Sequence, residues 1–263
     1  MPEAPELIYF KNYVQSTSLK KTIASVEVLN GNILENSTEE DLVNHLEGRE
    51  FESCSIHGKY LFLHTDSDHD LVMHFGMTGS PVYFKNEEEK PEYSRAEIHF
   101  DNGYTLSYNC LRMLGVLDLT DNKEEYIQSK ELGPDVTSET FDSEVFIEQL
   151  KGRRGYIKSA LMDQKRLAGI GNECSDEILF QAGIHPKKEV SELDKEDLKL
   201  IYHELTHVIN EKAEANKPDG QLPDSFLLKN REEGGECPNC AGSIEKITIG
   251  GRNGYYCPSC QKE

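Results

Sequence analysis

No run of apolar residues in this 263-residue chain approaches the length of about 20 that a membrane-spanning helix needs. We find no signal-peptide pattern and no internal repeat either. Basic residues are scarce: 28 Lys and Arg stand against 48 Asp and Glu, for a formal net charge of −20. A charge of that sign argues against a polyanionic partner. These absences predict a cytoplasmic globular protein, long enough for two modest domains.

The charge is unevenly distributed along the chain, however. Residues 151–188 contain eight Lys and Arg against four Asp and Glu, a surplus of four positive charges. Acidic runs such as residues 87–89 lie elsewhere. The distribution therefore matters more than the sum, and residues 151–188 are the stretch most suited to an anionic partner.

Hydrophobic spacing predicts an α+β protein. Residues 5–16 have the helical period, and short alternating runs typical of strands follow up to about Leu119. Asn102-Gly103 lies between two such runs and predicts a type I′ hairpin turn, in which both residues have positive φ. We expect a β-sandwich domain flanked by helices over residues 1–120 and a linker over residues 121–142.

Beyond the linker the helical period returns. Leu198, Ile201 and Leu205 belong to the most clearly amphipathic helix of the sequence. Asn172 is expected to be the N-cap of another helix, and residues 214–236 resemble a loop. We therefore expect a helical domain over residues 143–235 and a finger over residues 236–263.

The cysteine spacing predicts a metal site. Four of the seven cysteines form two C-x-x-C pairs separated by sixteen residues. Four thiolates satisfy tetrahedral zinc, so we expect one structural Zn²⁺ in a small β-hairpin finger, with redox pairs as the alternative. The three other cysteines are expected to be buried apolar residues. The expected ligands are Cys237, Cys240, Cys257 and Cys260, and the buried ones are Cys54, Cys110 and Cys174.

The chain starts with Met-Pro-Glu-Ala-Pro-Glu. If Met1 is removed, Pro2 carries a secondary amine that is partly neutral near pH 7 and can attack carbon to form an iminium. Glu3 and Glu6 supply carboxylates for proton transfer or charge stabilisation. On these six residues alone the ordinary interpretation is favoured, since proline suits the first turn of a helix. Residues 169–172, Gly-Ile-Gly-Asn, leave a similar choice between an ordinary turn and an anion site at a helix N-terminus.

Residues 169–186 closely resemble the helix–two-turn–helix signature of the Fpg/Nei family, the formamidopyrimidine-DNA glycosylases and endonuclease VIII-like enzymes. The resemblance extends to the Pro-Glu-x-Pro-Glu start, to residues 58–61, 74–79 and 132–134, and to Gly251-Arg252 in the four-cysteine finger. It implies a bifunctional DNA glycosylase and AP lyase of base excision repair. Its partner would be double-stranded DNA with damaged bases or abasic sites, which it would bind as a monomer at the cytoplasmic nucleoid.

The resemblance also implies residue roles. Pro2 matches the nucleophile that attacks C1′ of the damaged nucleotide and permits β- and δ-elimination. Glu3 matches the carboxylate thought to protonate the opening sugar, with Glu6 close behind, and Lys59 matches a phosphate contact beside the lesion. For the wedge positions at 77 and 114, plain core packing is the alternative. The DNA-binding set is Met77, Arg112 and Leu114, which fill the void left by the flipped base, and Asn172 and Arg252, which hold phosphates.

Departures from the family pattern bear on the lesion range. Ala4, Cys110 and Leu114 differ from the usual residues, and residues 214–236 look too short for the loop that caps flipped 8-oxoguanine in bacterial Fpg. We expect cleavage of formamidopyrimidines, further-oxidised guanines and abasic sites rather than efficient removal of 8-oxoguanine. The alternatives are a non-catalytic binder of damaged DNA on the same scaffold and a generic zinc-ribbon factor, which leaves the N-terminal matches unexplained.

Overall fold

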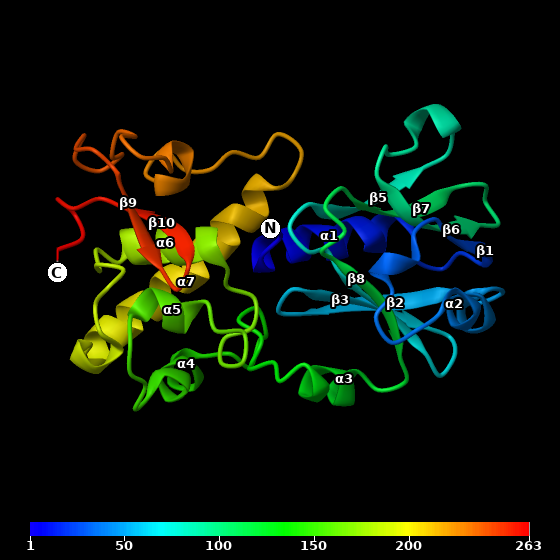
Figure 1. Cartoon of the computed structure of the whole chain (residues 1–263), viewed down its shortest axis with the longest axis horizontal. Coiled ribbons are helices and arrows are strands. Elements are labelled where there is room, and N and C mark those ends of the chain that lie inside the picture. Colours follow the sequence, from blue (N-terminus) through cyan, green and yellow to red (C-terminus); the bar gives the residue numbers. More distant parts are fainter. Residues whose placement is uncertain (263) are drawn as a thin grey trace. The chain divides into compact units, whose positions relative to one another are not determined.

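The computed structural model of the protein describes residues 1–262, which form two compact units (Figure 1). The first unit contains residues 1–2 and Glu6–Lys130, and the second contains Glu3–Pro5 and the chain from Glu131 onward. The division falls inside the predicted linker 121–142, but helix α3 (Lys123–Ser129) shows that this segment is not simply extended. The domain limits stay a prediction. Among the described residues no helix is long and apolar enough to cross a membrane.

The first unit is the predicted β-sandwich, built from two antiparallel four-stranded sheets. Helices α1 (Ala4–Thr17) and α2 (Glu39–Leu46) accompany them, with short 3₁₀ turns at Gly31–Ile33 and Glu87–Glu89. The first sheet has the order β1 (Ile23–Val28), β6 (Ser94–Phe100), β7 (Thr105–Cys110) and β5 (Gly79–Phe84). The second has the order β2 (Phe51–His57), β3 (Tyr60–Thr65), β4 (Asp70–His74) and β8 (Val116–Thr120).

The side chains of strand β3 alternate between the core of the sandwich and its outer face, which α3 covers. Successive side chains of a strand point to opposite faces. Leu61 and Leu63 of β3 therefore join the main core, which also includes residues of α1 and of the other sheet. Phe62, between them, packs instead with Val72 and with Tyr126 of α3. The predicted linker is helical here because it has an apolar face to cover.

The turn between β6 and β7 differs from the prediction. Gly103 has a φ of 78°, but Asn102 is not among the residues with positive φ. The Phe100 amide donates to the Tyr104 carbonyl at 2.8 Å, and the Gly103 amide donates to the Phe100 carbonyl at 3.0 Å. This is a three-residue loop in which a glycine with positive φ completes the turn. A type I′ turn is therefore wrong, although the hairpin itself is present.

The second unit contains a helical part and a finger. Its helices are α4 (Ser143–Leu150), α5 (Ile157–Leu161), α6 (Asn172–Gln181) and α7 (Lys195–Ala215), and its hairpin strands are β9 (Glu245–Ile249) and β10 (Arg252–Tyr256). Short 3₁₀ turns lie at Val190–Glu192 and at η4 (Leu227–Asn230), the latter inside the segment predicted as a loop. Helix α7 confirms the amphipathic pattern, with Leu198, Ile201 and Leu205 buried.

The finger packs against α6. Phe180 of α6, Leu227 of η4 and Ile244 of the finger belong to one apolar cluster, together with two of the finger cysteines. All three side chains are at most 1% exposed. The helix that follows the Gly-Ile-Gly-Asn motif is thereby held against the finger that carries Arg252.

Candidate nucleic-acid interface and catalytic residues

The side chain of Glu3 is buried at the start of α6. It is 1% exposed. Its Oε2 accepts backbone N–H bonds from Gly171 and Cys174, both at 2.9 Å, and its Oε1 accepts one from Glu173 at 3.0 Å. The first N–H groups of a helix have no acceptor within the helix, so this carboxylate caps α6 from a distant part of the chain.

The expectation for Asn172 as N-cap is therefore wrong. Gly171 occupies the N-cap position, with a φ of −123° and no side chain to accept a hydrogen bond, and Asn172 is the first helical residue. A β-carbon on Gly171 would lie 2.2 Å from both Cδ and Oε1 of Glu3. The amide of Ala4 also donates to the Gly169 carbonyl at 3.0 Å. The motif is an anion site, and the anion it holds is the chain's own Glu3.

Pro2 precedes Glu3 by one peptide bond, so the anchoring of Glu3 limits where Pro2 can lie. Pro2 is half-buried, whereas Met1 is 42% exposed. The Pro2 nitrogen belongs to a peptide bond while Met1 is attached and becomes a basic secondary amine once Met1 is removed. Glu6 is half-buried in the first turn of α1.

Lys59 lies in the tight turn between β2 and β3, after Gly58 with a φ of 58°. It is 7% exposed. His74, at the end of β4, pairs in register with Tyr60, and their ring centroids are 4.8 Å apart. Burial first, and the charge of Lys59 second, lower the pKa of His74 to about 4. His74 is thus a neutral imidazole near a cation, a pairing that sequence reasoning did not single out although the residue opens the 74–79 motif.

The wedge residues lie on loops of the first unit. Met77 is 43% exposed and Leu114 is 54% exposed, so core packing does not explain either of them. Arg112 is also exposed, and its backbone amide donates to the Thr78 hydroxyl at 3.2 Å. A β-carbon on Gly76 would lie 2.5 Å from the Leu114 carbonyl carbon, so the two loops touch through backbone.

Two further apolar side chains join this surface. Leu111 is 48% exposed and Met113, which has a φ of 48°, is 37% exposed. Exposed apolar side chains gathered on neighbouring loops indicate a surface made for contact. Neither residue could be singled out from the sequence, because an apolar residue after a strand is ordinarily expected to be buried.

The two residues predicted to hold phosphate are brought together in the second unit. Asn172 Nδ2 donates to the Asn253 carbonyl at 2.7 Å, which ties the start of α6 to β10. Arg252, the residue before Asn253, is exposed, and its Nη1 lies 3.7 Å from Met162 Sδ. Positions that are far apart in the sequence therefore present an amide and a guanidinium group from adjoining elements.

A buried ion-pair network lies directly behind this pair. Lys158 Nζ contacts Asp176 Oδ1 at 2.7 Å, with both side chains fully buried. Arg231 donates from Nε and Nη2 to Asp176 Oδ2 at 2.9 and 2.7 Å. Lys158 also donates to the Ser175 hydroxyl and to the Asn172 carbonyl, at 2.7 and 3.1 Å. The network fixes the backbone that carries Asn172.

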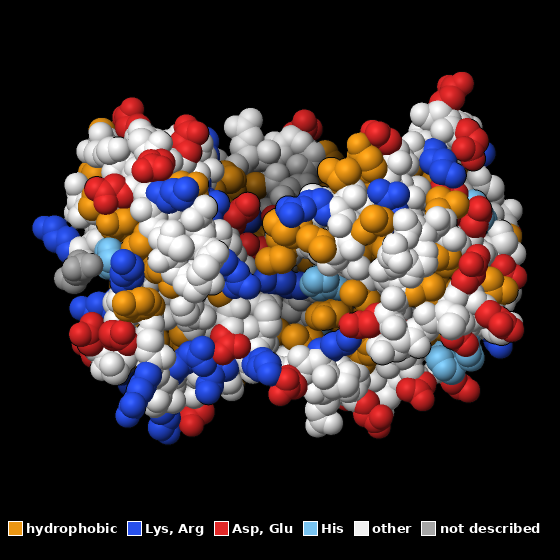
Figure 2. Space-filling view, in the orientation of Figure 1, with side chains coloured by type: hydrophobic (Ala, Val, Ile, Leu, Met, Phe, Trp, Pro, Cys, Tyr) orange, Lys and Arg blue, Asp and Glu red, His pale blue; other side chains and the backbone are white. Residues whose placement is uncertain are grey.

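Residues 151–188 expose less positive charge at the surface than their sequence predicts. Lys158 faces the interior, and Arg153 pairs with Asp163 at 2.8 Å, so neither adds free positive charge to the surface. Figure 2 shows Lys and Arg side chains over α4 while acidic side chains are spread over both units. The positive surplus available to a polyanion is smaller than the sequence indicates.

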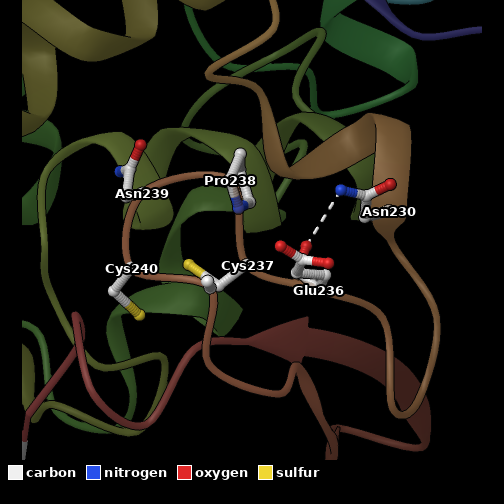
Figure 3. Close-up of a pocket in the computed structure, with 7 residues that line it drawn as sticks. Asn230, Glu236, Cys237, Pro238, Asn239 and Cys240 are labelled. Carbon is white, nitrogen blue, oxygen red and sulfur yellow. Dashed lines mark hydrogen bonds between the residues drawn. The ribbon is translucent and has the colours of Figure 1, made fainter.

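The four finger cysteines converge as predicted. Their sulfur atoms all lie within 4.8 Å of one another, with Cys237 to Cys260 at 3.8 Å and Cys240 to Cys257 at 3.5 Å. Figure 3 shows the first knuckle, where Asn230 donates from Nδ2 to the Glu236 carbonyl at 2.9 Å and so fixes the chain that enters it. Four thiolates at this separation fit a tetrahedral zinc ion.

One other group within residues 1–262 has ligand atoms within 4.8 Å of one another, formed by Glu27, Glu97 and His99. Glu97 is already neutralised by Lys90 at 2.9 Å and accepts from the Ser94 hydroxyl at 2.7 Å. We therefore interpret this group as a partly buried ion-pair cluster of the first sheet.

Comparison with known proteins covers nearly the whole chain. Residues 1–117 match the formamidopyrimidine-DNA glycosylase N-terminal domain, residues 132–221 match the H2TH domain of the same enzyme, and residues 234–262 match a zinc finger found in FPG and IleRS. The formamidopyrimidine-DNA glycosylase of Streptococcus pneumoniae is 31% identical over 275 residues, which span 100% of this chain and 99% of that protein.

Solved structures agree with this. A Lactococcus lactis Fpg bound to DNA containing an abasic site superposes with a TM-score of 0.88 at 26% identity, covering 99% of this chain and 100% of that one. A complex of the Lactococcus lactis protein with DNA containing FAPY-dG gives a TM-score of 0.89 at 26% identity and the same coverage. The same arrangement of sandwich, helices and finger thus occurs in proteins solved on damaged DNA.

Proposed function

Because the chain belongs to the formamidopyrimidine-DNA glycosylase family, we propose that Pro2 is the nucleophile with which it excises oxidised bases and cleaves abasic sites in base excision repair. The observation that supports this most directly is the capture of Glu3 by the first turn of α6. It anchors the residue that directly follows Pro2, whose nitrogen becomes a secondary amine when Met1 is removed.

The chemistry follows from that amine. Its lone pair attacks C1′ of the damaged nucleotide, and the bond to the base breaks with its electron pair on the base. The nitrogen then loses its proton, and the bond between C1′ and the ring oxygen breaks as that oxygen gains a proton, so the nitrogen lone pair forms an iminium. The iminium draws electrons from C2′, so a proton can be lost there and the 3′ phosphate expelled. A second elimination releases the 5′ phosphate. Hydrolysis of the remaining iminium returns the free amine.

We propose that each unit contributes residues that contact DNA. We assign Lys59 and His74 to phosphate near the lesion, since one supplies a charge and the other a neutral N–H donor. We assign Asn172 and Arg252 to phosphates held by the second unit. The exposed wedge residues fill the space that the flipped nucleotide leaves, with Arg112 able to bond the unpaired partner base. We further propose that the protein acts as a monomer at the nucleoid.

The substrate range depends on the segment between α7 and the finger. Glu177 of α6 accepts backbone bonds from Leu227 at 3.1 Å and Leu228 at 2.8 Å, and Gln181 donates to the Ser225 carbonyl at 3.1 Å. Residues 225–231 are thus fixed to α6, which leaves little chain to close over a flipped base. We propose that formamidopyrimidines and abasic sites are cut faster than 8-oxoguanine.

Borohydride trapping tests the proposal. Reduction of the iminium should join the protein covalently to DNA containing an abasic site, and no adduct should form without borohydride. Duplexes with formamidopyrimidine or 8-oxoguanine should then be nicked at clearly different rates. Tight binding to abasic DNA with no trapped adduct would instead support the non-catalytic binder. Equal nicking of the two lesions would contradict the proposed lesion range alone.

A further inference from the structure

Exposed methionine sulfur is concentrated on the loops that carry the wedge residues. The chain has five methionines, of which Met73 and Met162 are buried, at 1% and 6% exposure. Met77 is 43% exposed and Met113 is 37% exposed. Met1 is exposed as well, but the proposed chemistry requires its removal. Oxidation of a thioether depends on access to its sulfur, so the wedge loops are where the mature chain offers methionine to an oxidant.

We propose that hydrogen peroxide oxidises Met77 and Met113 to the sulfoxide, and that sulfoxide at these two positions weakens the capture of damaged DNA. This inference rests on the proposed function, in which the wedge residues fill the space left by a flipped nucleotide. An apolar, flexible thioether suits a wedge between bases. The sulfoxide is polar and chiral, so placing it between bases removes water from a group that the bases do not solvate equally.

The oxidation transfers one oxygen atom. A lone pair of the methionine sulfur attacks one oxygen of hydrogen peroxide, and the O–O bond breaks with its electron pair on the other oxygen. That oxygen takes the proton of the transferred hydroxyl group and leaves as water. The sulfur has then lost two electrons, which the peroxide has gained. Methionine sulfoxide reductases reverse the change, with one enzyme for each sulfoxide epimer.

The surroundings of Met113 make one side of its sulfur harder to reach. Asn30 Nδ2 lies 3.2 Å from Met113 Sδ. Asn30 is itself fixed, because its Oδ1 accepts from the Asn32 amide at 3.1 Å and its backbone amide donates to the Arg95 carbonyl at 3.0 Å. The side-chain amide thus occupies one of the two lone-pair directions of the sulfur, and peroxide approaches from the other. We therefore expect Met113 to give mainly one sulfoxide epimer.

Peroxide treatment of the zinc-loaded protein tests the proposal. The reaction is stopped with catalase and followed by dithiothreitol, which reverses disulfides and sulfenic acids but not sulfoxides. Peptide mapping by mass spectrometry locates the added oxygen. Fluorescence anisotropy measures the Kd for a duplex with a tetrahydrofuran abasic-site analogue, which cannot form an iminium. The matched variant is Met77→Leu/Met113→Leu, which keeps apolar side chains of similar volume without sulfur. Each protein is compared with its own untreated sample, so any change in basal binding cancels.

We expect oxygen on Met77 and Met113, with Met73 and Met162 unmodified. The Kd of the wild type should rise about tenfold on oxidation and return to its starting value after treatment with both reductases. The Kd of the double leucine variant should change less than about twofold, since it has no thioether on the wedge loops. An equal rise in that variant, an unchanged Kd after both methionines are oxidised, or the absence of oxygen at these positions would overturn the inference.

The reductases also test the geometry at Met113. Peptides from the oxidised wild type and from oxidised Asn30→Ala are treated with each reductase separately. One enzyme should reduce nearly all of the Met113 sulfoxide from the wild type, whereas each should reduce about half of it from Asn30→Ala. An equal division in the wild type would overturn the role given to Asn30.

Borohydride trapping of the untreated wild type on abasic DNA runs in parallel. Failure to trap would overturn the proposed function, while the mapped oxidation sites would stand because they do not depend on catalysis. Trapping together with an unchanged Kd after oxidation would overturn the inference alone.

Discussion

Replacement of the Lys158 side chain should strongly destabilise the second unit. The Lys158 ammonium group is fully buried, 2.7 Å from the equally buried Asp176. Burial lowers the pKa of Lys158 and raises that of Asp176, and the opposite charge of the partner acts against each shift. Lys158→Met keeps most of the volume and removes the charge. Asp176 then retains only Arg231, on its other oxygen.

The expected cost can be estimated from this geometry. Removing one partner of a buried ion pair typically costs about 3–5 kcal/mol, because the other charge is left without its partner in a poorly solvated site. The bidentate bond from Arg231 places the expectation near the lower end, at about 3 kcal/mol. For a chain of this size that loss corresponds to a fall in the melting temperature of about 6–12 °C. The carbonyl of Asn172 also loses a donor, so DNA affinity should fall as well.

Urea denaturation and differential scanning calorimetry measure the loss. Lys20→Met is the matched control, since Lys20 pairs with Glu52 at 3.1 Å while both side chains are more than half exposed. Such surface pairs contribute about 1 kcal/mol or less. If Lys158→Met were no less stable than Lys20→Met, the argument that this network holds the second unit together would be refuted.

Three further predictions follow from the same structure. The native pKa of His74, about 4, lies below its unfolded value of about 6.5, so the unfolded chain binds more protons than the folded chain between these two values. The free energy of unfolding of the wild type should therefore fall by up to about 3 kcal/mol as the pH drops through this window. Urea melts at pH 7 and 4.5 should show a smaller fall for His74→Gln, and an equal fall would contradict the assignment. Arg252→Ala should weaken binding to abasic DNA and reduce the slope of log K against log salt by about one, whereas Asn172→Ala should weaken binding with little change in slope; fluorescence anisotropy over a salt series checks both. Removal of zinc by a chelator, or Cys240→Ser, should unfold the finger and abolish DNA binding while the circular dichroism of the sandwich persists; retained affinity in the metal-free protein would contradict a role for the finger.

The parts of the fold that sequence could predict are those set by local periodicity and spacing. The alternation around Leu61 and Leu63 predicts strands of the sandwich, and the spacing of Leu198, Ile201 and Leu205 predicts α7. The two C-x-x-C pairs predict the finger. Each of these patterns acts within one element, so its signal survives without knowledge of the partner. The same holds for the signature at residues 169–186, whose length makes it specific.

The features that could not be predicted from the sequence depend on contacts between distant segments of the chain. Asn172 has a strong local preference for the N-cap position, but Glu3 supplies the acceptors from the other end of the chain, and Gly171 takes that position to make room. Lys158 resembled one more surface cation, because nothing nearby in the sequence indicates that Asp176 faces it from α6. Likewise the helical linker follows from the outward-facing Phe62, which only the folded sheet presents.

The most direct test of the central claim is to locate the covalent bond. The protein is reduced with borohydride on DNA containing an abasic site, digested with nuclease and protease, and mapped by mass spectrometry. We predict that Met1 is absent and that the sugar remnant lies on the nitrogen of Pro2, in the peptide that also contains Glu3. An adduct on a lysine such as Lys59, or a trapped protein that still carries Met1, would contradict the mechanism.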